Sequence, residues 1–152
     1  MALQIVTVAD SISKLTVTGA TMKDIDEIPE TTDMMDVPMI IPKPDGYLSG
    51  FRMLRVGLGP GTSAAINVAY TLTYRLLHSE VGEGMDGIFS TYSAMVAIVG
   101  VFLDAIIAND TITGAVDLQA ASITEFGLVY DSTGKVAFHG CDIGIEILEF
   151  VN

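Results

Sequence analysis

The sequence predicts an α+β fold, in which a mainly antiparallel sheet packs against a short N-terminal helix and one long helix. Three observations predict this fold class. Residues 64–80 alternate apolar and polar side chains with a period of two, the pattern of a strand. Residues 88–107 repeat apolar side chains every three to four positions, the pattern of a helix. Residues 115–130 and 135–151 flank the turn sequence DSTG, which predicts a closing hairpin.

The first part of the chain predicts a helix followed by a loop. Within residues 3–16, four apolar side chains have helical spacing and predict a short amphipathic helix: Ile5, Val8, Ile12 and Leu15. The polar sequence TGATMKDIDEIPETTDMMDVP comes next and is interrupted by glycine and proline. We therefore expect an ordered loop with little regular structure in this segment.

Two further strands are predicted before the long one. VPMIIPKP (37–44) is a short apolar run bounded by prolines. Because proline cannot donate a hydrogen bond to the sheet, this strand is expected either to lie at an edge or to end abruptly. FRMLRVGL (51–58) predicts a second strand, and GPGTS (59–63) predicts the turn that follows.

The long strand 64–80 raises the question of what it is for. Strands are usually about five or six residues long, and a small enzyme core rarely needs a longer one. The predicted helix 88–107 raises the same question, because apolar side chains occupy both of its sides. One face carries Ile88, Phe89, Tyr92, Met95, Val96, Val99, Phe102, Leu103, Ile106 and Ile107, and the other Ala94, Ala97, Ile98, Val101 and Ala105. Such a helix must be covered twice, by its own sheet and by something else.

Composition and charge narrow the possible functions. The chain has 152 residues, of which 50% are hydrophobic and 17% charged, so we expect one folded domain over residues 1–152. A mean hydropathy of +0.52 predicts apolar surface that is covered by neighbouring molecules. The net charge of −12 repels phosphate backbones, so sequence-specific nucleic-acid binding is not expected. The uncharged segment 87–103 is interrupted by a polar run at 90–93, and no membrane span is expected.

Several short motifs resemble binding sites but are better explained as structure. GLGPGTS (57–63) lacks the lysine and the following helix that a phosphate loop needs. DIDE (24–27) lacks the glycine that a calcium loop places at its sixth position. His139 and Cys141 share one strand face, yet the chain offers few further ligands to complete a metal site. As the single cysteine, Cys141 also excludes an intramolecular disulfide and indicates a reducing site of synthesis.

The polar residues around the end of the long strand do not predict catalysis either. His78, Ser79 and Glu80 are consecutive, so a strand would direct neighbouring side chains to opposite faces. Glu80 and Glu83 could act as paired carboxylates, but no third group frames them. We therefore expect a protein that is not an enzyme and that holds no metal and no cofactor.

The order of elements resembles the tail terminator, or tail completion, proteins of long-tailed bacteriophages and related viruses. The resemblance covers most of the chain. It rests on the N-terminal helix, the loop IDEIPETTDMMDVPMIIPKPDG, the strand YTLTYRLLHSEVGEG, the long helix with LDAIIANDTITGAV at its end, and the closing strand FHGCDIGIEILEFV. The sequence departs from the family in its very apolar helix and in its acidic balance.

The resemblance implies a virion structural protein, located in the tail or neck and assembled in the host cytoplasm. It implies a homo-oligomeric ring, usually of six copies, that caps the tail tube and then joins a head completion or connector protein. DNA would pass through the lumen of this ring without sequence-specific binding. In a closed ring each subunit needs two different contact patches, and an extended strand can continue the sheet of the next subunit.

Two sets of residues are candidates for these roles. Apolar residues of the strands and the helix are candidates for subunit contacts: Met39, Ile41, Tyr70, Tyr74, Ile98 and Val101. Carboxylates of the glycine-broken loop after the long strand are candidates for the lumen or for docking to a partner: Glu80, Glu83 and Asp86. Two alternatives stay open. One is another virion tube or connector subunit or a non-viral ring-forming scaffold, and the other is a small α+β ligand-binding or enzyme domain.

Overall fold

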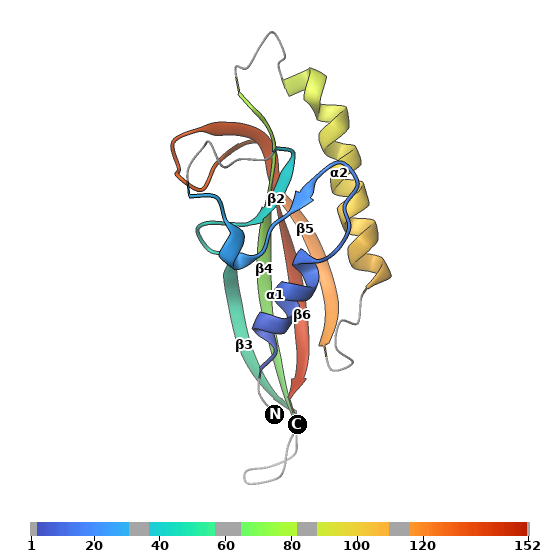
Figure 1. Cartoon of the computed structure of the whole chain (residues 1–152). Helices are drawn as coiled ribbons and strands as arrows, with labels where there is room; N and C mark the ends of the chain where they lie inside the picture. The colour runs from blue at the N-terminus through green and yellow to red at the C-terminus, as the bar shows by residue number, and fades with distance from the viewer. Residues whose placement is uncertain (1–2, 31–36, 57–64, 82–87, 110–115, 152) are drawn as a thin grey trace.

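The computed structural model describes residues 3–30, 37–56, 65–81, 88–109 and 116–151 (Figure 1). The helical elements are α1 (Ile5–Ser13), a short 3-10 helix η1 (Ile25–Glu27) and α2 (Ile88–Ala108). The strands are β1 (Thr21–Met22), β2 (Met39–Pro42), β3 (Leu48–Val56), β4 (Ala65–Glu80), β5 (Val116–Tyr130) and β6 (Ala137–Val151). The predicted short helix, long strand, long helix and closing hairpin are all present, and the predicted turn 59–63 lies outside the described residues.

The strands form one sheet in the order β1-β2-β4-β6-β5, and β3 also pairs with β4. β2 pairs with residues 74–77 of β4 and β3 with residues 65–72, so β2 and β3 lie end to end along the same side of β4. Among the described strands, the β1–β2 pair is parallel and every other pair is antiparallel. The predicted α+β fold with a mainly antiparallel sheet is therefore confirmed.

This order leaves β3 and β5 as the two edges of the longer part of the sheet, with β4 and β6 between them. Figure 1 shows β3 and β5 on opposite sides of the sheet. β2 ends at Pro42, and β1 pairs with it on its outer side. Of the two expectations for this proline-bounded strand, the abrupt end is the one that the structure has.

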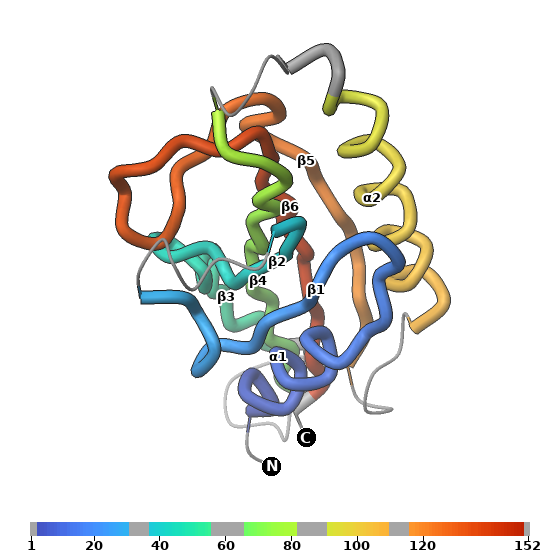
Figure 2. Tube along the Cα trace, turned by 45° about the horizontal axis from the view of Figure 1, so that its top comes forward, coloured from blue at the N-terminus to red at the C-terminus, as the bar shows by residue number. Residues whose placement is uncertain are grey.

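The main core lies between the sheet and both helices. Val8 and Ile12 of α1 and Phe102 of α2 belong to one buried cluster with alternate residues of β4 and β6. Alternation along β4 places Tyr74 in this cluster, where the centroid of its ring lies 6.0 Å from the centroid of the Phe102 ring. Figure 2 shows the segment after α1 bending toward α2. We call the side of the sheet that both helices cover the helix face, and the opposite side the open face.

The helix α2 packs on the sheet through one stripe of side chains: Met95, Ile98, Val99, Phe102 and Ile106. The sequence placed Ile98 on the side away from this stripe, and that assignment is wrong, because Ile98 is only 7% exposed. Conversely, the helical spacing grouped Val96 and Ile107 on one face with most of this stripe, but they are 51% and 72% exposed. The uniform apolar composition of this helix hides which side faces the sheet.

A second, smaller core covers the open face at the end of the sheet where β4 ends and β6 begins. We call this end the upper end of the sheet. It contains Met39, Ile41, Leu77, Val129 and Phe138, with loop residues packed beside them. The turn of the closing hairpin also lies at this end. There the Gly134 N–H donates to the Asp131 carbonyl at 3.0 Å, and Gly134 has a positive φ of 71° that suits glycine. The predicted DSTG turn is confirmed.

Two buried carboxylates are paired across the sheet. On the open face, Arg75 forms a bidentate ion pair with Asp142, with Nε–Oδ1 and Nη2–Oδ2 distances of 2.7 and 2.9 Å. On the helix face, Glu149 accepts hydrogen bonds from the Tyr70 hydroxyl at 2.5 Å and from the Gln4 backbone N–H at 2.9 Å. The second contact holds the start of α1 beside the end of β6, so both chain ends leave from the same end of the sheet (Figure 1).

Candidate functional site

The edge strand β3 is exposed on both of its faces. Met53 lies opposite Val68 on the helix face and Leu54 lies opposite Asn67 on the open face, yet they are 62% and 43% exposed. Leu48 and Phe51 on the same strand are 46% and 52% exposed. A strand with large apolar side chains exposed on both faces contributes little to its own core. Its free edge and its side chains are available to another molecule.

The opposite edge strand, β5, is also exposed on both faces, but its central residues are small. Residues 119–125 are all exposed, and they include the consecutive residues Ala120, Ala121 and Ser122. Nearer its end, Leu128 and Tyr130 are 57% and 54% exposed. Among the described strands, β3 and β5 are therefore two unpaired sheet edges on opposite sides of the sheet. Large side chains line β3, whereas β5 has small side chains at its centre and the larger Ile123, Leu128 and Tyr130 toward its end.

A groove lies between β5 and the last turns of α2. It has a volume of about 410 Å³ and is lined mainly by apolar side chains: Leu103, Ile106, Ile107, Leu118, Gln119, Ala120 and Ala121. Ile107 is 72% exposed at its margin, and Tyr92 and Val96 continue the exposed apolar surface along α2. The β5 edge thus has an apolar groove beside it.

The two edge strands also differ in charge. β3 carries Arg52 and Arg55 and no acidic residue, whereas β5 carries Asp117 and Glu125 and no basic residue. The Arg52 guanidinium lies 3.5 Å from the Glu146 carboxylate on β6, and both side chains are well exposed, so this ion pair is weak. Opposite charge on opposite edges favours contact between unlike edges over contact between like edges.

The predicted subunit-contact residues mostly lie elsewhere. Five of them are buried within the chain itself, with exposed fractions of 7% or less: Met39, Ile41, Tyr70, Tyr74 and Ile98. These side chains leave little surface for a neighbour, so their burial does not support a role as contacts between subunits, and that role stays a prediction. Val101 is partly buried beside the main core. Sequence reasoning identified apolar strand residues correctly, but it could not tell which of them the helices and the loop cover.

The predicted acidic loop is described only at its start. Glu80 is the last residue of β4 and is exposed. Glu83 and Asp86 lie outside the described residues. The role of these three carboxylates in a lumen or in docking remains a prediction.

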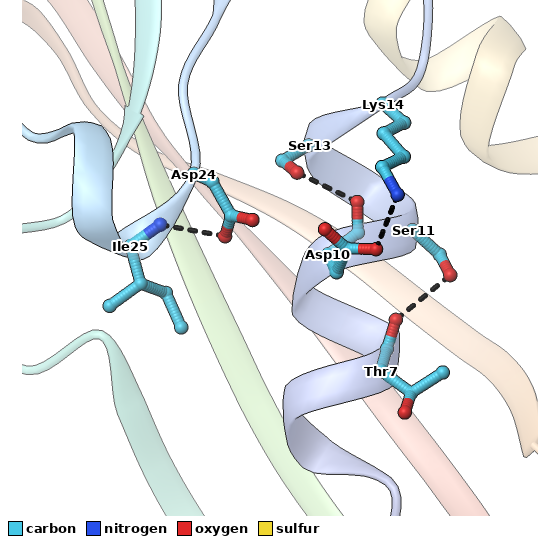
Figure 3. Close-up of polar contacts among 7 residues, drawn as sticks. All are labelled: Thr7, Asp10, Ser11, Ser13, Lys14, Asp24 and Ile25. Carbon is cyan, nitrogen blue, oxygen red and sulfur yellow. Dashed lines mark hydrogen bonds and ion pairs between the residues drawn. The ribbon is translucent and has the colours of Figure 1, made fainter.

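A second groove, of about 500 Å³, lies between α1 and η1 and is lined by Val6, Thr7, Asp10, Asp24, Ile25 and Asp26. Figure 3 shows that two of its carboxylates, Asp10 and Asp24, bind groups of their own local segments. Asp10 forms an ion pair with Lys14 at 2.7 Å, which lowers the pKa of Asp10. Asp24 accepts a hydrogen bond from the Ile25 N–H at 2.7 Å, while Glu27 accepts one from the Asp24 N–H, so the pair caps η1. The DIDE sequence is thus explained as a helix cap.

The histidines and the cysteine lie near the upper end of the sheet. His139 is 4% exposed, and its Nδ1 lies 3.0 Å from the Thr91 hydroxyl of α2. Partial burial, with a smaller effect of His139, lowers the pKa of His78, whose Nδ1 lies 3.3 Å from the Ser79 hydroxyl. Burial raises the pKa of the Cys141 thiol to about 12. Within the described ranges, no three His, Cys, Asp or Glu side chains come together as metal ligands.

Comparison with known proteins gives no family for the chain: no protein-family model matches the sequence, and no curated protein matches it. One stretch of α2, Thr91–Ala108, is long and apolar enough to cross a membrane, with a mean hydropathy of 2.0. Core helices of soluble proteins have the same property, and in this fold α2 packs against the sheet.

Proposed function

We propose that this chain is a structural subunit that assembles head to tail into a closed ring, and that the ring terminates the tail tube of a virus and joins it to the head. One observation supports the ring above all others. In the part of the chain that the structure describes, the sheet has two unpaired edge strands on opposite sides, β3 and β5, and each is exposed on both faces.

Two unlike edges favour a ring over a symmetric dimer. In a two-fold dimer the same patch of both subunits meets itself, so one edge would stay uncovered. When the β3 edge of each copy meets the β5 edge of the next, both edges are covered in every copy, provided that the rotation closes. The opposite charges of the two strands support this unlike pairing.

The place of the ring in a virion rests on the resemblance in element order to tail terminator proteins. The expected partners are further copies of the chain, usually six in that family, the tail tube protein and a head completion or connector protein. The net charge of −12 supports a lumen through which DNA passes without adhering. In this function the protein carries out no catalysis and needs no cofactor.

Negative-stain electron microscopy and sedimentation of the purified chain test the ring, with and without its tube partner. The expected result is a ring with a central hole, on its own or on tube ends. A chain that sediments as a monomer at every concentration, even beside the tube protein, contradicts the proposal. Rings that form but never join tubes or heads would instead favour a different ring-forming scaffold.

A further inference from the structure

The two edge strands match each other in length and irregularity. Two rows of paired residues cross the four strands from β3 through β4 and β6 to β5: Arg52–Ala69–Leu148–Asp117 and Leu48–Leu72–Ile145–Ala121. Between these rows the central strands β4 and β6 advance by three residues, whereas β3 and β5 each advance by four. Each edge strand therefore contains a one-residue bulge at the same level of the sheet.

The strand directions are also compatible with pairing between copies. β3 is antiparallel to β4, β4 to β6, and β6 to β5, so β3 and β5 of one copy run in opposite directions. A neighbour related by rotation about an axis along the strands keeps these directions. Its β3 would therefore run antiparallel to β5, and the sheet would continue across the junction with the same alternation.

We propose that β3 of one copy adds to β5 of a second copy in the register that places Arg52 opposite Asp117 and Leu48 opposite Ala121. This inference rests on the proposed ring and specifies its contact. One register places both pairs opposite each other, because the bulge in each strand makes β3 and β5 advance by the same four residues between the two rows. Without matching bulges, a strand that fitted at Arg52 would be shifted by one residue at Leu48, and its side chains would point to the wrong face.

The side chains that meet in this register are complementary. Arg52 and Asp117 belong to the row of Ala69 and Leu148 on the open face, where opposite charges in directly opposed positions attract. Leu48 and Ala121 belong to the row of Leu72 and Ile145 on the helix face. There the large, 46% exposed Leu48 would meet a small residue that lines the groove beside α2.

Disulfide cross-linking between two different variants tests the register directly. Leu48→Cys protein is mixed with Ala121→Cys protein, both in a Cys141→Ala background, and then mildly oxidised. Within one chain the two positions are separated by three strand spacings of about 4.8 Å each, too far for a disulfide. A covalent dimer on a non-reducing gel therefore reports contact between copies, and the expected result is a dimer only in the mixture.

Two controls make the result specific. Leu48→Cys mixed with Thr124→Cys is expected to give no dimer, because Thr124 lies on the open face, three residues from Ala121. In a second assay, Asp117→Arg is expected to raise the concentration needed for assembly up to about fivefold per contact, and adding Arg52→Asp is expected to restore it. Apart from the buried Cys141, which is replaced in every cross-linking variant, the altered side chains lie on the edge strands. Circular dichroism verifies that each variant is folded.

The outcomes separate this inference from the proposed function. Rings in the micrographs without a Leu48→Cys/Ala121→Cys dimer, or with an equal dimer from the Thr124→Cys control, overturn the register and leave the ring standing. Failure of the charge exchange to restore assembly would also count against the Arg52–Asp117 contact. A chain that stays monomeric beside its tube partner overturns the ring and this contact together.

Discussion

The central strands and the edge strands contain similar apolar side chains, but only those of the central strands are covered. On β4, Tyr70, Leu72 and Tyr74 are at most 1% exposed, because α1 and α2 pack over them. On β3, Phe51 and Met53 are more than half exposed. The comparison teaches that position in the sheet, not apolar composition, decides whether a residue stabilises the subunit or is available to a neighbour. Substitutions in the centre should therefore weaken folding, and substitutions at the edges should weaken association.

The largest effect is expected from Gly140→Ala in the centre. A Cβ atom at this position of β6 would lie 1.8 Å from the Leu76 carbonyl oxygen and 2.8 Å from a methyl group of Val129. The neighbouring backbone would have to move, and we expect a loss of at least about 3 kcal/mol in the free energy of unfolding. Urea denaturation followed by circular dichroism measures it.

Gly100→Ala on the exposed side of α2 is the matched control. No atom lies within 4 Å of a Cβ placed there, so the same change should stabilise the helix by about 1 kcal/mol. A Gly140→Ala variant as stable as the original protein would show that the close approach of β4 and β6 at this point is wrong.

The next effect is expected from Arg75→Met. The Asp142 side chain is 2% exposed, and this change leaves its carboxylate without the bidentate arginine partner. An uncompensated buried charge costs about 3–5 kcal/mol, and Lys43, 3.9 Å from Asp142, should offset part of that cost. Arg55→Met on the exposed edge strand is the comparison and should change the unfolding free energy by less than about 0.5 kcal/mol. Equal losses in both variants would contradict the distinction between centre and edge.

The smallest effect on folding is expected from Met53→Thr at the β3 edge. Met53 is 62% exposed, so the unfolding free energy should change by less than about 0.5 kcal/mol, while assembly weakens. Met39→Thr removes a completely buried side chain from β2 and should cost about 2–5 kcal/mol. Thermal denaturation and sedimentation of the two variants measure folding and assembly separately. A Met53→Thr protein that assembles normally would argue against the β3 edge as a contact.

Much of the fold could be predicted from the sequence, because its pattern is strong where one face of an element is buried. The alternation in 64–80 gave β4, and the turn sequence DSTG gave the hairpin of β5 and β6. The pattern fails for α2, whose composition is apolar on every side, so Ile98 was assigned to the wrong face. Alternation also could not show what covers Tyr70 and Tyr74, since that depends on where α1 and α2 pack.

The contact surface was harder to predict for a related reason. β3 has the sequence LSGFRMLRV, in which apolar residues do not alternate strictly and a bulge lies between Ser49 and Arg52. Since neither face of this strand is buried by its own subunit, no period of two is imposed on it. The irregular pattern, with large apolar residues beside two arginines and no acidic residue, was the available signal for an exposed edge. The matching bulge in β5 depends on pairing across the sheet and leaves no signal in the sequence.

The common position of the two chain ends has a practical consequence for imaging. α1 begins and β6 ends at one end of the sheet, while β4 leaves toward α2 at the other (Figure 1). In a ring whose strands run along its axis, a fluorescent protein or an affinity tag fused to either terminus would gather on one rim. The other rim would stay bare, so labelled particles would have a recognisable polarity in side views. For the same reason, a bulky fusion at either terminus would obstruct whichever partner binds that rim.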